Sequence, residues 1–91
     1  MERTDKILAD RGSRYGNYLE QATLCSGIRW HVLGTIERRG MEIAPDQHDA
    51  LYMISVKLSR IANGDPNYAD NWRDIAGYAT LVADRLEDKS R

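Results

Sequence analysis

Apolar residues recur at helical spacing along every long segment of this chain, and no segment shows sustained two-residue alternation. Steps of three and four residues place apolar side chains on one face of an α-helix, whereas a half-buried strand alternates at every second residue. The sequence therefore predicts an all-α fold. With 91 residues the chain corresponds to a single domain, residues 1–91, and a domain of this size buries only about 60–65% of its unfolded surface. Because such a core is modest, we expect a homo-oligomer.

Four helices are expected, one short and three longer, packed as a compact bundle. The short helix begins at Thr4 or Asp5 and extends through residues 9–11, where a glycine ends it. Pro45 fits the first turn of a later helix, and Gly64-Asp65-Pro66 forms a sharp turn. The longer helices are expected over residues 18–38, from 45 to the turn at 64, and over 68–87.

Each longer helix has an apolar stripe that we expect to be buried. The stripe of the first contains Leu24, Ile28, Val32 and Ile36. The next helix is apolar on two sides, Leu51, Ile54, Leu58 and Ile61 on one and Tyr52, Met53 and Val56 on the other. The stripe of the last helix contains Trp72, Ile75, Ala79, Val82 and Leu86, and its opposite, acidic face contains Asp70, Asp74, Gly77, Leu81, Asp84 and Asp88. A helix that is apolar on two sides is either central or shared with a partner chain.

The charge balance excludes some partners. The chain has 13 Lys and Arg against 14 Asp and Glu, and a nucleic-acid binder usually has a clear basic excess. Its only cysteine, Cys25, allows neither an internal disulfide nor a zinc site built from cysteines. The start of the chain is polar and no apolar run approaches the length of a membrane span. We therefore expect a cytoplasmic protein without nucleic-acid or membrane partners.

Charged residues flank the turn at residues 63–66 with helical spacing. Lys57 and Arg60 precede the turn, and Asp70 and Asp74 follow it on one helix face. The cationic pair suits a phosphate, since arginine offers a bidentate fork, and the two carboxylates suit Mg²⁺. The same four residues also suit salt bridges between two antiparallel helices, and both interpretations remain open.

A loop near the start of the chain offers a second candidate region. The sequence Arg11-Gly-Ser-Arg-Tyr15-Gly-Asn17 combines two arginines, an aromatic ring and two glycines. Backbone amides freed by glycine can cradle an anion beside Arg11, and Tyr15 could stack on a base. The loop lacks the strand and the Lys-Ser/Thr ending of a phosphate loop. The alternative is a helix-capping turn whose tyrosine fills the core.

Four patterns are spread over residues 8–86: Arg11-Gly12-x-x-Tyr15-Gly16, Pro45-x-x-x-x-Ala50-Leu51, Met53-x-x-x-Lys57-x-x-Arg60 and Asp70-x-x-x-Asp74-x-x-Gly77-Tyr78. Together they resemble a small phage-encoded domain of uncharacterised function that is common in tailed-phage and prophage genomes. More remotely, the chain is similar to nucleotide-modification-associated phage domains and to MazG-like all-α nucleoside triphosphate pyrophosphohydrolases. The resemblance implies the cytoplasm of a host cell as the compartment.

The MazG-like enzymes are helical, usually oligomeric, and hold Mg²⁺ with carboxylates on two adjacent helices. Their resemblance implies a nucleotide ligand, with Mg²⁺ as a cofactor. The implied ligand-binding residues are Lys57, Arg60, Arg11 and Tyr15, and the implied metal ligands are Asp70 and Asp74. Lys57 and Arg60 stand where the enzymes carry glutamates, so only one carboxylate pair is matched. Nucleotide binding is therefore the primary hypothesis, and no catalytic residue is assigned.

Two other interpretations need no small-molecule ligand. The chain could be a non-enzymatic phage protein that binds a host or defence component through the apolar face containing Tyr52, Met53 and Val56. It could also be a homo-oligomeric bundle in which the charges on both sides of the turn are purely structural.

Overall fold

A computed structural model of the chain describes residues 4, 7–8 and 14–89, and these residues form helices and loops without a strand. The helices are α2 (Tyr18–Arg38), α3 (Pro45–Asn63) and α4 (Ala69–Leu86). They confirm the all-α class and the limits expected for the three longer helices. Three helices are thus described rather than four, because the short helix expected before Gly12 falls largely on residues outside the described ranges.

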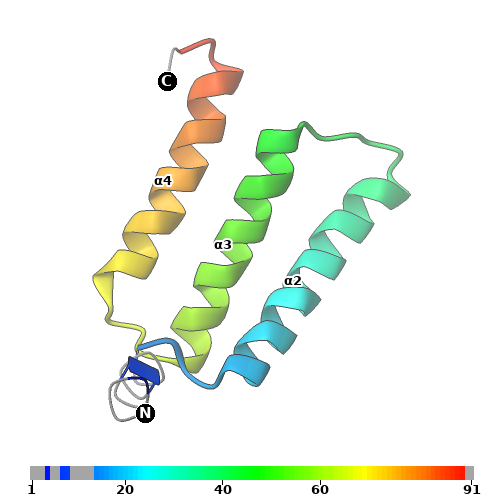
Figure 1. Cartoon of the computed structure of the whole chain (residues 1–91). Coiled ribbons are helices and arrows are strands. Elements are labelled where there is room, and N and C mark those ends of the chain that lie inside the picture. Colours follow the sequence, from blue (N-terminus) through cyan, green and yellow to red (C-terminus); the bar gives the residue numbers. More distant parts are fainter. Residues whose placement is uncertain (1–3, 5–6, 9–13, 90–91) are drawn as a thin grey trace.

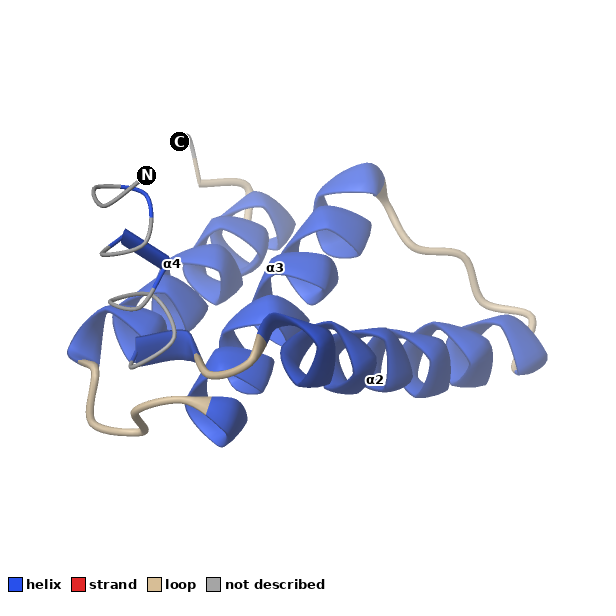
Figure 2. Cartoon of the chain, turned by 60° about the horizontal axis from the view of Figure 1, so that its bottom comes forward, coloured by secondary structure: helices blue, strands red, loops and turns tan. Residues whose placement is uncertain are grey.

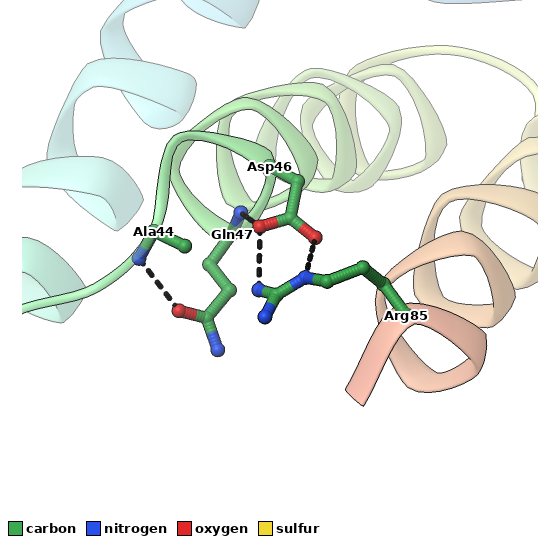
Figure 3. A network of polar contacts seen from close by, with 4 residues as sticks. All are labelled: Ala44, Asp46, Gln47 and Arg85. Carbon is green, nitrogen blue, oxygen red and sulfur yellow. Dashed lines mark hydrogen bonds and ion pairs between the residues drawn. The ribbon is translucent and has the colours of Figure 1, made fainter. Parts of the chain in front are cut away.

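Local hydrogen bonds explain where the helices begin. The Asn17 side chain accepts a hydrogen bond from the backbone N–H of Glu20 at 3.2 Å, which satisfies one free donor at the start of α2. At the start of α3, the backbone N–H of Ala44 donates to the Gln47 side chain at 2.8 Å (Figure 3). Pro45 occupies the first turn of α3, where its missing N–H costs no hydrogen bond.

The three helices lie side by side with α3 in the middle (Figure 1). α2 and α4 each pack on α3, and among the described residues they make no contact with each other. Figure 2 shows the same arrangement after rotation, with the long α2 beside α3 and away from α4. The radius of gyration is 15.5 Å, whereas a compact domain of this length would have about 12 Å. The helical bundle is therefore open, and less compact than the sequence suggests.

The buried interior is small and mostly polar. Among the described residues, the buried apolar side chains are Cys25 and Ala50, whereas the buried polar ones are Gln21, Ser55, Lys57, Ser59, Asn71 and Asp84. None of the described helices has the length and apolar character needed to cross a membrane. The described part of the chain therefore has few fully buried apolar side chains, although apolar burial is the main favourable term in folding.

The structure corrects the buried stripes expected from periodicity. Leu24 and Val32 of α2 are 38% and 37% exposed, and Trp72 and Leu86 of α4 are 53% and 59% exposed. Asp84, expected on a solvated acidic face, is only 5% exposed. The physical reason is the open arrangement: each outer helix is covered by α3 on one side only. The expectation that the doubly apolar helix is central is confirmed for α3.

A bidentate ion pair joins the start of α3 to the end of α4. Arg85 donates from Nε and Nη2 to the two carboxylate oxygens of Asp46, at 2.8 and 2.7 Å (Figure 3). Asp46 also accepts from the backbone N–H of Gln47 at 3.0 Å. The hydrogen bond from Arg85 lowers the pKa of Asp46 below its ordinary 3.8. This pair fixes the antiparallel packing of the two helices at the end away from the Gly64 turn.

The Asp46–Arg85 pair predicts a specific loss of stability in acid. The folded state lowers the pKa of Asp46, so the pair stabilises fully above pH 3.8 and loses its effect as the pH falls below that value. We expect the free energy of unfolding of Arg85→Gln to lie below that of the wild type near neutral pH, and the two to converge as the pH falls through the lowered pKa of Asp46. Urea unfolding at a series of pH values measures this difference. Arg73→Gln is the control, because it breaks an exposed ion pair within α4. If its free energy of unfolding approached that of the wild type in acid by the same amount, the acid effect would not come from the Asp46–Arg85 pair.

Candidate functional site

Two backbone segments cross closely below the ends of α3 and α4. The segment before α2 lies against the turn between α3 and α4 (Figure 1), and the backbone N–H of Asp65 donates to the carbonyl of Arg14 at 2.9 Å. A Cβ added at Gly64 would overlap the backbone carbonyl of Arg14, and one added at Gly16 would overlap the carbonyl of Asn63. Gly16 also has a φ of +83°, which favours glycine. Two glycines thus allow the crossing.

This crossing assembles what we call the tyrosine–arginine cluster: Arg14, Tyr15, Arg60 and Tyr68. The Cζ atom of Arg60 lies 4.4 Å from the centre of the Tyr15 ring, and that of Arg14 lies 5.1 Å from the centre of the Tyr68 ring. The two rings meet edge to face, with centres 6.1 Å apart. Cations over aromatic faces attract the ring electrons, and edge-to-face rings attract each other. Three separate segments therefore converge on one cationic, aromatic surface.

Arg60 has an unsatisfied donor inside this cluster. Its Nε is buried and has no hydrogen-bond partner among the described residues. A buried N–H without an acceptor costs about 1–3 kcal/mol, and an anion supplying an oxygen would remove that cost. The position therefore favours an anionic ligand over an unoccupied surface.

Asp70 sets the polar edge of the cluster. The Tyr68 hydroxyl donates to the Asp70 carboxylate, and this hydrogen bond raises the pKa of Tyr68 above its ordinary 10.0. Asp70 also accepts from Arg73 at 3.2 Å. Tyr68 is therefore a neutral donor at physiological pH, and the carboxylate of Asp70 interacts with Tyr68, which precedes α4, and with Arg73 of α4.

Lys57 and Asp74 form the ion pair between helices that was one of the two open interpretations. Nζ of Lys57 lies 2.8 Å from Oδ2 of Asp74, and the two side chains are 11% and 46% exposed. Lys57 is thus neutralised between α3 and α4. The structure separates the four charged residues by role: Lys57 pairs with Asp74, Arg60 stacks on Tyr15, and Asp70 pairs within α4.

The carboxylates do not form a protein-held metal centre on their own. Within the described part of the chain, no three His, Cys, Asp or Glu side chains are grouped to hold a metal ion. Asp46 is bound by Arg85 at the far end of α3, so it does not join Asp70 and Asp74. Mg²⁺ is commonly held by one or two carboxylates together with phosphate oxygens. A Mg²⁺ ion that arrives with a phosphate ligand would have to compete with Lys57 for Asp74 and with Arg73 for Asp70.

Sequence reasoning identified two members of the cluster and missed two. Tyr15 and Arg60 were predicted ligand residues, and the structure brings them together. Arg11, also predicted, lies outside the described residues. Arg14 and Tyr68 were missed because nothing in their spacing shows that they meet. The only signal was the pair of glycines at positions 16 and 64, and their contact is visible only in three dimensions.

The chain belongs to the family described as Domain of unknown function (DUF6378), which matches residues 1–86. No curated protein and no solved structure matches the chain. The family match includes all three described helices and all four residues of the tyrosine–arginine cluster. The cluster is therefore part of the family domain.

Proposed function

We propose that this chain is a phage-type nucleotide-binding protein of the host cytoplasm, and that it binds its ligand at the tyrosine–arginine cluster. The observation that supports this most is the buried Nε of Arg60, which lacks an acceptor while its guanidinium lies 4.4 Å from the Tyr15 ring centre. A ligand with both an anionic and an aromatic part satisfies both features.

The phosphate part of the ligand is proposed from the arginines. Arg14 and Arg60 come from different segments and lie on adjacent rings. A guanidinium offers several donors in one plane and matches phosphate oxygens bidentately. In this proposal Lys57 has a supporting role, because its charge is already balanced by Asp74 at 2.8 Å. Arg11 remains a proposed phosphate contact on the basis of the sequence alone.

The base is proposed to bind beside Tyr15. Aromatic side chains stack on nucleobases with about 1–3 kcal/mol per base, largely independent of base identity. Mg²⁺ would accompany the phosphates, with Asp70 and Asp74 as its carboxylate ligands. Two carboxylates are fewer than a pyrophosphohydrolase of the MazG-like type uses, so binding is proposed ahead of hydrolysis.

Replacing Arg60 tests the proposal. Titration calorimetry with a panel of deoxynucleoside triphosphates and Mg²⁺ is expected to show binding by the wild type, and Arg60→Gln should weaken it by roughly tenfold or more, since a charge-assisted hydrogen bond is worth about 1.5–3 kcal/mol. Arg39→Gln is the matched control, because Arg39 is an exposed residue that follows α2 at the opposite end from the cluster. If no nucleotide binds, or both variants bind equally well, the proposal is wrong.

The alternative is a non-enzymatic phage interaction protein that binds a host or defence component through an apolar helix face. The face expected for this role is partly covered: Arg29 of α2 lies 4.2 Å above the Tyr52 ring, and Met53 and Val56 are half-buried. The apolar side chains of α2 suit a protein partner better than this face of α3 does, since Leu19 and Trp30 are 73% and 76% exposed.

A further inference from the structure

One face of α2 is apolar and grooved, and among the described residues only Asn63, at the end of α3, lines the groove from outside α2. The face begins near Leu19 and continues past Leu24 and Val32, all of them exposed. A shallow groove along it is lined chiefly by Leu19, Leu24, Gly27, Ile28, His31 and Val32. An added Cβ at Gly27 would meet nothing within 4 Å. The space over Gly27 is therefore open to another helix.

The chain exposes more area than the average compact monomer of its mass. Its accessible surface is 6857 Å² for 10.4 kDa, whereas a compact monomer of that mass would expose about 5,400 Å². The excess, about 1,500 Å², exceeds the roughly 800 Å² that each partner buries in a standard protein interface. One full interface therefore fits within the surplus surface.

The charges at the two ends of α2 are complementary in an antiparallel pair of these helices. Glu20 lies in the first turn of α2 and Arg38 in the last. They are eighteen residues, or about five turns, apart, so both side chains lie on the same side of the helix. In an antiparallel pair of α2 helices, Glu20 of each copy would lie opposite the partner's Arg38. The same register places Leu24 opposite the partner's Gly34, which has no side chain of its own and is flanked by the Arg38 side chain.

We propose that two copies of this chain form a dimer in which their α2 helices pack antiparallel along this groove. A two-fold axis near residue 29 generates every contact twice, as an isologous interface requires. Gly27 allows the helices to approach closely, and Leu24 and Val32 supply apolar contact. The Glu20–Arg38 pairs fix the register at both ends. A second copy of the chain fits this face because, when α2 is turned end to end, Glu20 of each copy meets the partner's Arg38.

Sedimentation velocity of the full chain tests the dimer over a range of concentrations. The wild type is expected at twice the 10.4 kDa mass of one chain. Leu24→Glu should weaken the dimer by roughly tenfold or more, because it places an unpaired charge in the apolar part of the interface. Leu81→Glu is the matched control, since Leu81 is 54% exposed on α4, and its dimer should keep the wild-type affinity. Circular dichroism checks that each variant retains its helices.

Charge reversal tests the antiparallel register independently of folding. Glu20→Arg and Arg38→Glu change exposed residues, and each alone should weaken the dimer because like charges then face each other. The double variant restores opposite charges and should recover most of the affinity. A monomer at every concentration, a dimer insensitive to Leu24→Glu, or a double variant no tighter than the single ones would each overturn the proposal.

Discussion

Replacing Gly64 with alanine is expected to lower the free energy of unfolding by about 3 kcal/mol or more, which lowers the melting temperature by roughly 10 °C or more. The new Cβ would overlap the backbone carbonyl of Arg14. Backbone atoms cannot rotate away as a flexible side chain does, so the crossing has to separate. Separation also breaks the 2.9 Å hydrogen bond from Asp65 to Arg14. Thermal melting followed by circular dichroism measures the effect.

Gly77→Ala is the matched control for this prediction. Gly77 lies within α4, and an added Cβ there meets nothing within 4 Å. The same substitution should therefore stabilise the protein by up to about 1 kcal/mol through helix propensity alone. The opposite signs follow from the surroundings of the two glycines, because the chemical change is identical. A Gly64→Ala protein as stable as the wild type would show that the crossing does not form in solution.

Asp74→Asn is expected to cost about 1–3 kcal/mol of stability. The substitution removes the partner of Lys57, whose side chain is only 11% exposed, and an unpaired buried charge costs about 3–5 kcal/mol. The expected cost is smaller than that of a fully buried charge because Asp74 is 46% exposed and water screens part of the interaction. Urea unfolding near neutral pH measures the change.

A second substitution separates the lost pair from other effects of Asp74→Asn. Lys57→Met keeps most of the buried side-chain volume and removes the charge, so the double variant should recover most of the lost stability. Asp70→Asn is the control, because Asp70 is 58% exposed and pairs with Arg73. If the double variant is no more stable than Asp74→Asn alone, Lys57 is not the group that Asp74 stabilises.

The Asp74 variants also bear on the proposed ligand site. If the Lys57–Asp74 pair is purely structural, Lys57→Met with Asp74→Asn should bind nucleotide as the wild type does, while Arg60→Gln does not. If Asp74 holds Mg²⁺ with the phosphates, nucleotide affinity should fall in the double variant even though stability recovers. Measuring affinity and stability on the same proteins therefore assigns the Lys57–Asp74 pair to the fold or to the ligand.

The helices were predictable from the sequence because their signals are local. Asn17 and Pro45 mark helix starts through a side-chain hydrogen bond and a missing N–H, respectively, and Gly64 marks the end of α3. These features act within one turn of helix, so neighbours distant in sequence do not alter them. The Lys57–Asp74 pair was foreseeable for a related reason, since a short turn places the charges before and after it on facing helices.

Burial and the cluster were decided only by the tertiary structure. Periodicity shows that α2 and α4 each have an apolar face, but it does not show that α3 covers only one side of each. Asn71 and Asp84 are therefore buried, whereas Trp72 and Leu86 are exposed. Arg60 meets Tyr15 because two glycines let distant backbone segments cross. Helix limits depend on neighbours within a few residues, whereas exposure and contact depend on which segments pack together, and that is fixed by the fold as a whole.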